Sequence, residues 1–288
     1  MKKYKKGIFF IILSAFCFSL MNMFVKLSGD LPSIQKAFFR NLIALIVAAF
    51  LLWKSHTPFR CQKKDLGLLF VRSLFGTIGI LCNFYAIDHL NLSDASMLNK
   101  LSPFFVIIFS YFFLKEKIKP TQALCVFLAF VGSLFIIKPS FQFVEAFPAI
   151  LGFAGGMAAG AAYTVVRILG LRGEKGGFIV FFFSSFSCLV TLPYILFSYE
   201  PMTLLQLSYL LLAGIFASGG QFAITAAYTY APGREISIYD YTIVIFAGIW
   251  SLLLWAEIPD ILSVAGYLII FGSSLIIFLY NRKQEAVH

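Results

Sequence analysis

The chain is dominated by long apolar runs that short polar segments separate. Ten of these runs hold about 20 residues each, the length that a helix needs to cross a bilayer core of about 30 Å. They lie at residues 7–26, 35–53, 66–87, 93–114, 120–138, 148–168, 176–198, 203–230, 235–256 and 261–281. The pattern therefore predicts an all-α membrane protein with ten transmembrane helices. The composition agrees, because 60% hydrophobic and 12% charged residues are too apolar for a soluble domain.

Polar residues within or beside these runs recur at an interval of 141 residues. The matching pairs are Lys26 with Arg167, Asn99 with Asp240, and Glu116 with Glu257. Each pair occupies the same place in the hydrophobic pattern of its half, so we predict two five-helix repeats, at 1–142 and 143–288. Because each repeat has an odd number of helices, the two would cross the membrane in opposite orientations, as the inverted repeats of many transporters do.

The net charge of +10 follows membrane topology and does not indicate nucleic acid. If the N-terminus is cytoplasmic, 17 Lys and Arg residues fall in inner segments, and only Lys26, Lys36 and Lys138 fall in outer ones. Such an excess on the cytoplasmic side is the positive-inside rule. We therefore expect a multi-pass protein of the cytoplasmic membrane with both termini in the cytoplasm, in contact with the lipid bilayer and with no nucleic-acid partner.

Four charged residues lie inside the predicted spans, where each costs about 2.5–3.5 kcal/mol on insertion scales. Arg72 and Asp240 lie at similar distances from the cytoplasmic ends of their spans, at about 1.5 Å per residue. We therefore predict that they pair across the two halves. Arg40 and Lys100 lie nearer the outer face, and two interpretations stay open for both. In the first interpretation the side chain extends outward to carboxylates in the loops, and this is favoured for Arg40. In the second it binds an anionic group in a cavity, and this is favoured for Lys100.

Amide and aromatic side chains on the same spans suit a polar organic solute and complete a candidate site. The candidate substrate-binding residues are Asn22, Arg40, Arg72, Asn99, Lys100, Tyr163, Gln221, Tyr239 and Asp240. Pro103 lies inside the fourth span, where it removes a backbone hydrogen bond and is a candidate hinge. The fifth and tenth spans have few polar residues, so we place them outside the transport path, facing lipid or a homodimer partner.

The sequence contains no pattern that indicates a cofactor site, a metal site or a catalytic site. The five cysteines are scattered, and no spacing suggests a metal site or a disulfide framework. A membrane enzyme would need a nucleophile, a metal set or paired acids at one depth, and we predict no catalytic residue. A channel would need a continuous polar ring, whereas the polar groups here are sparse. A carrier is therefore favoured over both.

Together these residues resemble the drug/metabolite transporter superfamily, in its EamA-type form with ten helices in two repeats. The residues that carry the resemblance are Lys26, Phe38–Arg40, Arg72 with Gly76, the stretch from Tyr85 through Ser102 and Pro103 to Glu116, and the run that ends at Glu257. The resemblance implies a central cavity lined by the first, third, fourth, sixth, eighth and ninth spans, and transport by alternating access. Val244, which stands where the second half often has a proline, departs from the family pattern.

We therefore expect a secondary transporter that moves a small polar metabolite, amino-acid-like or S-adenosylmethionine-like. The second of these follows from Tyr239–Tyr241 and Glu257–Asp260, which are similar to family members that move S-adenosylmethionine. Asp240 would hold the amino group or take part in proton coupling, and Lys100 or Arg40 would receive the carboxylate. The alternative is a carrier of anionic metabolites, nucleotide-like or carboxylates. A coupling proton or an exchanged solute, and a homodimer, belong to the same hypothesis.

Overall fold

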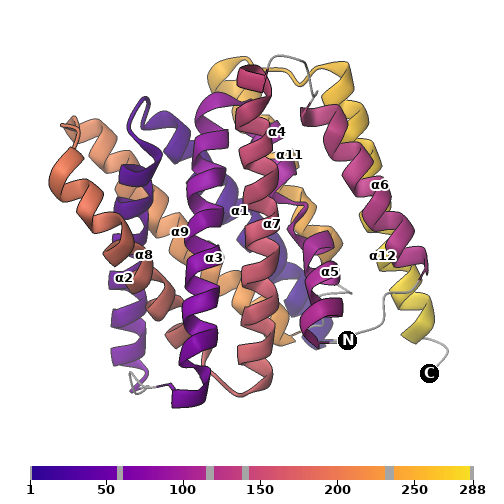
Figure 1. Ribbon diagram of the computed structural model, residues 1–288, viewed down its shortest axis with the longest axis horizontal. Helices are drawn as coiled ribbons and strands as arrows, with labels where there is room; N and C mark the ends of the chain where they lie inside the picture. Colours follow the sequence, from indigo (N-terminus) through magenta and orange to yellow (C-terminus); the bar gives the residue numbers. More distant parts are fainter. Residues whose placement is uncertain (1, 57–60, 115–119, 138–142, 231–236, 286–288) are drawn as a thin grey trace.

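A computed structural model describes residues 2–56, 61–114, 120–137, 143–230 and 237–285. Within these ranges every regular element is helical (Figure 1). The elements are α1 (Lys2–Leu27), α2 (Ser33–Lys54), η1 (Lys63–Asp65), α3 (Leu66–His89), α4 (Leu92–Asn99), α5 (Ser102–Leu114), α6 (Pro120–Ile137), α7 (Phe143–Leu171), α8 (Gly176–Ser198), α9 (Leu204–Tyr230), η2 (Ser237–Tyr241), α11 (Thr242–Trp255) and α12 (Ile261–Glu285). The start of α1 and the end of α12 lie at the same end of the bundle (Figure 1).

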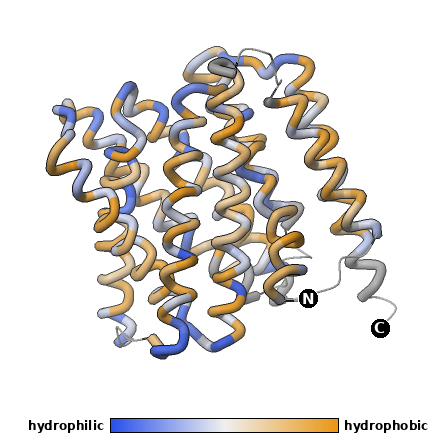
Figure 2. Tube along the Cα trace, in the orientation of Figure 1, coloured by the Kyte–Doolittle hydropathy of each residue, from blue (hydrophilic) through white to orange (hydrophobic). Residues whose placement is uncertain are grey.

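The helices have the length and the surface of membrane spans. In the described part of the chain, eight helical segments are long and apolar enough to cross a membrane, and two shorter apolar helices, Ala123–Ile136 and Tyr239–Trp255, accompany them. Hydrophilic residues gather at the two ends of the bundle, and hydrophobic stretches lie between them (Figure 2). Large apolar side chains such as Phe112, Phe197 and Leu204 point outward. The protein is therefore a multi-pass membrane protein, since such a surface suits lipid and not water.

The main helix contacts relate the two halves of the chain to each other. The closest neighbours are α1 with α9, α3 with α7, α2 with α8, and α6 with α12. At an interval of 141 residues, α1 corresponds to α7, and α3 corresponds to α9. The α1–α9 contact is therefore equivalent to the α7–α3 contact. The other two contacts each join equivalent helices. The α6–α12 pair lies at one side of the bundle (Figure 1).

The fourth predicted span is two helices and not one bent helix. The first of them, α4, ends at Asn99, and α5 begins at Ser102. Pro103 therefore lies in the first turn of α5, and its role as a hinge stays a prediction. A proline ring collides with the carbonyl group four residues earlier, which here belongs to Asn99, so the chain leaves the helix before the proline.

The ninth predicted span changes from 3₁₀ to α-helical geometry, although it has no proline. The short 3₁₀ helix η2 ends at Tyr241, and α11 begins at Thr242, two residues before Val244. Lys100, which lies between α4 and α5, corresponds to Tyr241 at the interval of 141 residues. Both halves therefore depart from α-helical geometry at equivalent positions, and the departure in the second half does not depend on proline.

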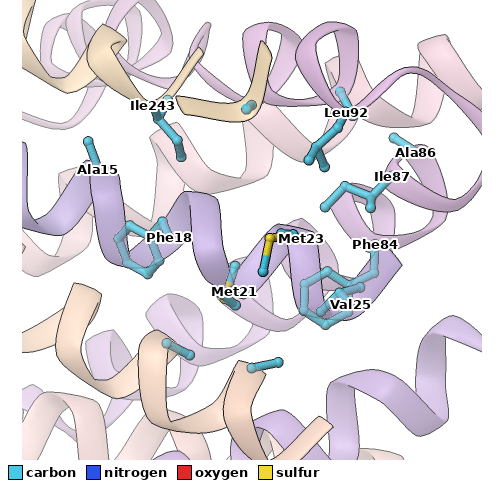
Figure 3. Close-up of a cluster of buried hydrophobic side chains, with 14 of the residues drawn as sticks. Ala15, Phe18, Met21, Met23, Val25, Phe84, Ala86, Ile87, Leu92 and Ile243 are labelled. Atoms are coloured by element: carbon cyan, nitrogen blue, oxygen red, sulfur yellow. The ribbon is translucent and has the colours of Figure 1, made fainter. Parts of the chain in front are cut away.

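A buried apolar cluster joins the helices around the centre of the bundle. Met21, Met23 and Val25 of α1 lie among side chains of α3 and α4 such as Phe84 and Leu92 (Figure 3). The cluster also includes residues of α9 and α11. It fixes the helices that line the cavity described below.

Glycines on α7 allow this helix to approach α4 and α5 closely. Gly152, Gly156 and Gly160 share one face of the helix, and a Cβ at Gly156 would lie 2.5 Å from the carbonyl oxygen of Leu98. The small-residue face predicts close helix packing, and the structure confirms it. Through this contact α7 positions the end of α4, next to Lys100.

Candidate functional site

A cavity of about 80 Å³ lies between helices of the two halves. Its walls come from α1, α2, α3, α4, α7, α8, α9 and α11. Seven of the nine candidate binding residues line it, and these are Asn22, Arg40, Arg72, Asn99, Lys100, Tyr163 and Gln221. The lining includes the helices that the family resemblance implies, and it also takes residues from α2 and α8.

Arg72 lies on α3 against the aromatic ring of Phe183, which belongs to α8. Its Cζ is 3.9 Å from the ring centroid, a cation–π contact, and the side chain is almost fully buried. Gly76 makes room for this arrangement, because a Cβ at that position would collide with both side chains. Nε and Nη1 of Arg72 have no hydrogen-bond partner among the described residues.

Arg40 is held by a short chain of hydrogen bonds on α2 and α8. Its Nη1 donates to Oδ1 of Asn41, and Nδ2 of Asn41 donates to Oγ of Ser187 at 2.9 Å. The residue is 1% exposed and lines the cavity, so the interpretation in which Arg40 extends outward is wrong. Its Nε has no hydrogen-bond partner in the described part of the chain.

Lys100, and not Arg72, is the partner of Asp240. The distance from Nζ of Lys100 to Oδ2 of Asp240 is 2.6 Å, and both side chains are buried. The hydroxyl group of Tyr241 donates to the carbonyl oxygen of Lys100 at 2.9 Å. The predicted Arg72–Asp240 pair is therefore wrong. That prediction placed the two residues at one depth in the membrane by assuming continuous α-helices. The chain departs from α-helical geometry beside Lys100 and at Asp240.

The remaining candidate residues divide between the cavity and the core. Asn22 and the neighbouring Asn83 are buried, and Oδ1 of each has no hydrogen-bond partner among the described residues. Tyr239 instead packs against Phe278, with ring centroids 6.2 Å apart, and is not part of the lining. Asp240 contacts the cavity only through Lys100. The described residues contain no group of three or more His, Cys, Asp or Glu that could hold a metal ion.

An ion pair closes one end of the bundle between the two halves. Nζ of Lys26 lies 2.8 Å from both carboxylate oxygens of Glu257, and it donates to the carbonyl oxygen of Leu90 at 3.1 Å. Ser251 donates to the same carboxylate at 2.8 Å, and the ring of Trp255 lies 5.0 Å from Nζ. We call this group the Lys26–Glu257 latch. It joins the end of α1 to the segment after α11, and both helices line the cavity.

A different ion pair lies at the end of the bundle where α3 begins. Nη1 of Arg172 is 2.6 Å from Oδ1 of Asp65, which is fully buried. This pair joins η1, which leads into α3, to the residue that follows α7. The repeat partners of the latch are Arg167 and Glu116, and Glu116 lies outside the described residues.

Comparison with known proteins finds relatives along the whole chain. The sequence model of the EamA-like transporter family matches residues 5–138 and again 146–279, and the two matches begin and end 141 residues apart. The chain is 32% identical over 268 residues to the pseudopaline exporter CntI of Pseudomonas aeruginosa (strain UCBPP-PA14), which covers 92% of this chain and 93% of that protein. It is 28% identical to human solute carrier family 35 member G1, over 93% of this chain and 78% of that protein.

One solved crystal structure also has a similar fold. It shares 16% sequence identity with this chain and superposes with a TM-score of 0.68, over 98% of this chain and 99% of that one. At this level of identity the similarity supports the fold alone.

Proposed function

The chain belongs to the EamA-like transporter family, and we propose that it is a secondary transporter that moves a small polar organic metabolite by alternating access. The family and these relatives are transporters and not enzymes. The central cavity carries the proposal, because Arg40, Arg72 and Lys100 face it from inside a bundle whose outer surface is apolar. Buried charges are costly inside a membrane, and in such proteins they mark substrate or ion pathways.

The architecture that we propose is ten spans in two inverted repeats, 1–142 and 143–288. The double match to the family model at an interval of 141 residues supports it. The equivalence of the α1–α9 contact and the α3–α7 contact also supports it. Inverted repeats give a bundle two related conformations, one open to each side of the membrane. We place the termini in the cytoplasm and the Lys26–Glu257 latch at the outer face of the cytoplasmic membrane.

The size of the cavity indicates that the bundle must move to bind a metabolite. The volume of the cavity is about 80 Å³. Sites for small organic molecules usually have about 300–1,000 Å³. The cavity would therefore widen when the helices separate at one end, and the latch would hold the other end closed during that step.

The Lys100–Asp240 pair suits a substrate that carries an α-amino acid group. An ammonium group of the substrate could replace Lys100 beside Asp240, while its carboxylate binds Lys100. Amino-acid-like and S-adenosylmethionine-like compounds share this zwitterionic group, so the contact supports both. The similarity to an exporter of pseudopaline supports an organic metabolite and outward transport.

The coupling and the oligomer belong to the same proposal. Asp240 would take a proton when Lys100 leaves it, which provides a route for proton coupling; exchange of two solutes would need no proton. The outward faces of α6 and α12 carry exposed apolar residues such as Phe127 and Leu268. Neither helix lines the cavity, so this pair could contact a second copy of the chain without blocking transport.

Counterflow in proteoliposomes tests the transporter. Purified protein is reconstituted with labelled L-glutamate, L-methionine, S-adenosylmethionine or uridine monophosphate outside and unlabelled solute inside. A carrier gives saturable uptake that the internal solute accelerates, and empty liposomes give the background. Flux that rises linearly without counterflow would indicate a channel, and conversion of the solute would indicate an enzyme.

A further inference from the structure

The cavity contains more positive charge than its own residues neutralise. Its described lining includes Arg40, Arg72 and Lys100 but no Asp or Glu. Asp240, the acid that reaches this region, is bound to Lys100. Within the described part of the chain, no ion pair joins Arg40 or Arg72 to a carboxylate. Two guanidinium charges therefore remain at the centre of the bundle.

These two charges are buried and permanent. Arg40 is 1% and Arg72 is 3% exposed, and an arginine side chain stays protonated at any physiological pH. A buried charge without a counter-ion is strongly unfavourable. Two such charges beside one cavity therefore favour an anion at that place.

Neighbouring residues hold both guanidinium groups, and some of the buried N–H donors of these groups lack a hydrogen-bond partner among the described residues. The Asn41–Ser187 hydrogen bonds fix Arg40, and the ring of Phe183 fixes Arg72. Nε of Arg40 and both Nε and Nη1 of Arg72 have no partner among the described residues. The planar guanidinium fork is the side chain best suited to bind a carboxylate through two parallel hydrogen bonds.

From these observations we infer that Arg40 and Arg72 form a binding site for two carboxylate groups of one substrate. The cargo is then an organic acid with at least two carboxylates, and Lys100–Asp240 receives a further amino-acid group where one is present. The inference rests on the proposed function and names its substrate class. The proposed substrate therefore carries a net negative charge, and a single zwitterionic group is not enough to define it.

Binding to purified wild-type protein in detergent tests the inference without transport. The probes are malonate, succinate, glutarate and adipate, each compared with its diamide and with chloride at equal ionic strength. A ligand that binds only the folded protein raises its melting temperature. We expect at least one dicarboxylate to raise the melting temperature, and the diamides to leave it unchanged. If chloride stabilises as well as every dicarboxylate, or if none stabilises, the inference is wrong.

Three variants separate binding from folding. Arg40→Gln and Arg72→Gln should each weaken the binding of the best dicarboxylate about tenfold or more, since each removes charge-assisted hydrogen bonds. The ligand-free melting temperature of each variant is measured as well, because each loses a buried charge and also a contact, the Asn41 hydrogen bond of Arg40 or the Phe183 contact of Arg72. The control is Lys54→Gln, which removes an exposed charge from the same helix as Arg40 and should preserve binding. Undiminished binding of the best dicarboxylate by the Arg40→Gln and Arg72→Gln variants would overturn the inference.

The transport assay keeps the two proposals distinguishable. Saturable counterflow of L-methionine without any effect of dicarboxylates would leave the transporter in place and refute the dianionic substrate. Dicarboxylate binding without counterflow of any solute would support the site and refute the transporter.

Discussion

Lys100 and Asp240 form an ion pair across the two halves of the chain, with 2.6 Å between Nζ and Oδ2. Each residue lies where its half interrupts a membrane helix, Lys100 between α4 and α5 and Asp240 in η2. The pair therefore joins the two halves at the points where each departs from α-helical geometry. A substrate that competes for either partner would act directly on the relative position of the two halves.

Asp240→Asn should abolish or severely reduce transport and also destabilise the protein. The substitution leaves the ammonium group of Lys100 buried without its counter-ion, which costs about 3–5 kcal/mol when a buried pair is broken. Lys100→Met combined with Asp240→Leu should recover much of that stability, because no buried charge remains, while transport stays lost. Thermal melting and counterflow of the single and double variants measure the two effects. Equal melting temperatures for Asp240→Asn and wild type would contradict the buried pair.

Breaking the Lys26–Glu257 latch should open the end of the bundle that it closes. Glu257→Gln removes the negative charge but keeps the shape of the side chain, so the attraction between the end of α1 and the segment after α11 falls. Spin labels at the exposed positions Asp30 and Ile258, in a variant without other cysteines, report the distance between these segments. We expect the population with longer distances to increase in Glu257→Gln.

The control for this experiment is Arg172→Gln, which breaks the ion pair at the other end of the bundle. It should leave the distance between the labels unchanged. If Glu257→Gln also leaves it unchanged, the latch does not hold this end closed.

The sequence predicted the membrane class, because burial in a membrane restricts charged residues strongly, and the binding role of the candidate residues stays a prediction. Arg40, Arg72 and Lys100 were recognisable from their positions inside apolar runs alone. Their partners were not. Estimating the depth of a residue in the membrane from its place in the sequence assumes a continuous α-helix. The chain is not α-helical next to Lys100 or at Asp240.

Other features of the site had no separate signal in the sequence. Phe183 is one of 35 phenylalanines, and only the folded structure brings its ring to Arg72. Lys26 and Glu257 were recognised as repeated residues, but repetition shows equivalence and not contact. Crossing the two repeat pairs would have suggested the latch, because α1 contacts α11, which belongs to the fourth span of the second half.

The orientation of the protein can be tested at two exposed positions. The excess of basic residues predicts that the loop after α1 is outside and that η1 is in the cytoplasm. A cysteine at Asp30 should therefore react with a membrane-impermeant maleimide added to intact cells, and a cysteine at Lys63 should react only after the membrane is permeabilised. Labelling of Lys63→Cys in intact cells, with Asp30→Cys protected, would reverse the topology.

Two glycines of α7 provide a matched test of how closely this helix must pack against α4. A Cβ at Gly156 would lie 2.5 Å from the carbonyl oxygen of Leu98, whereas a Cβ at Gly170 would meet nothing within 4 Å. Gly156→Ala should therefore destabilise the protein by about 1–3 kcal/mol, the usual cost of overpacking. Because α4 ends beside Lys100, the displaced helix should also weaken transport. Gly170→Ala should leave the melting temperature unchanged or slightly raised, since alanine favours the helix over glycine. Thermal melting of both variants decides the point, because equal effects would mean that helix propensity, and not contact with α4, determines the result.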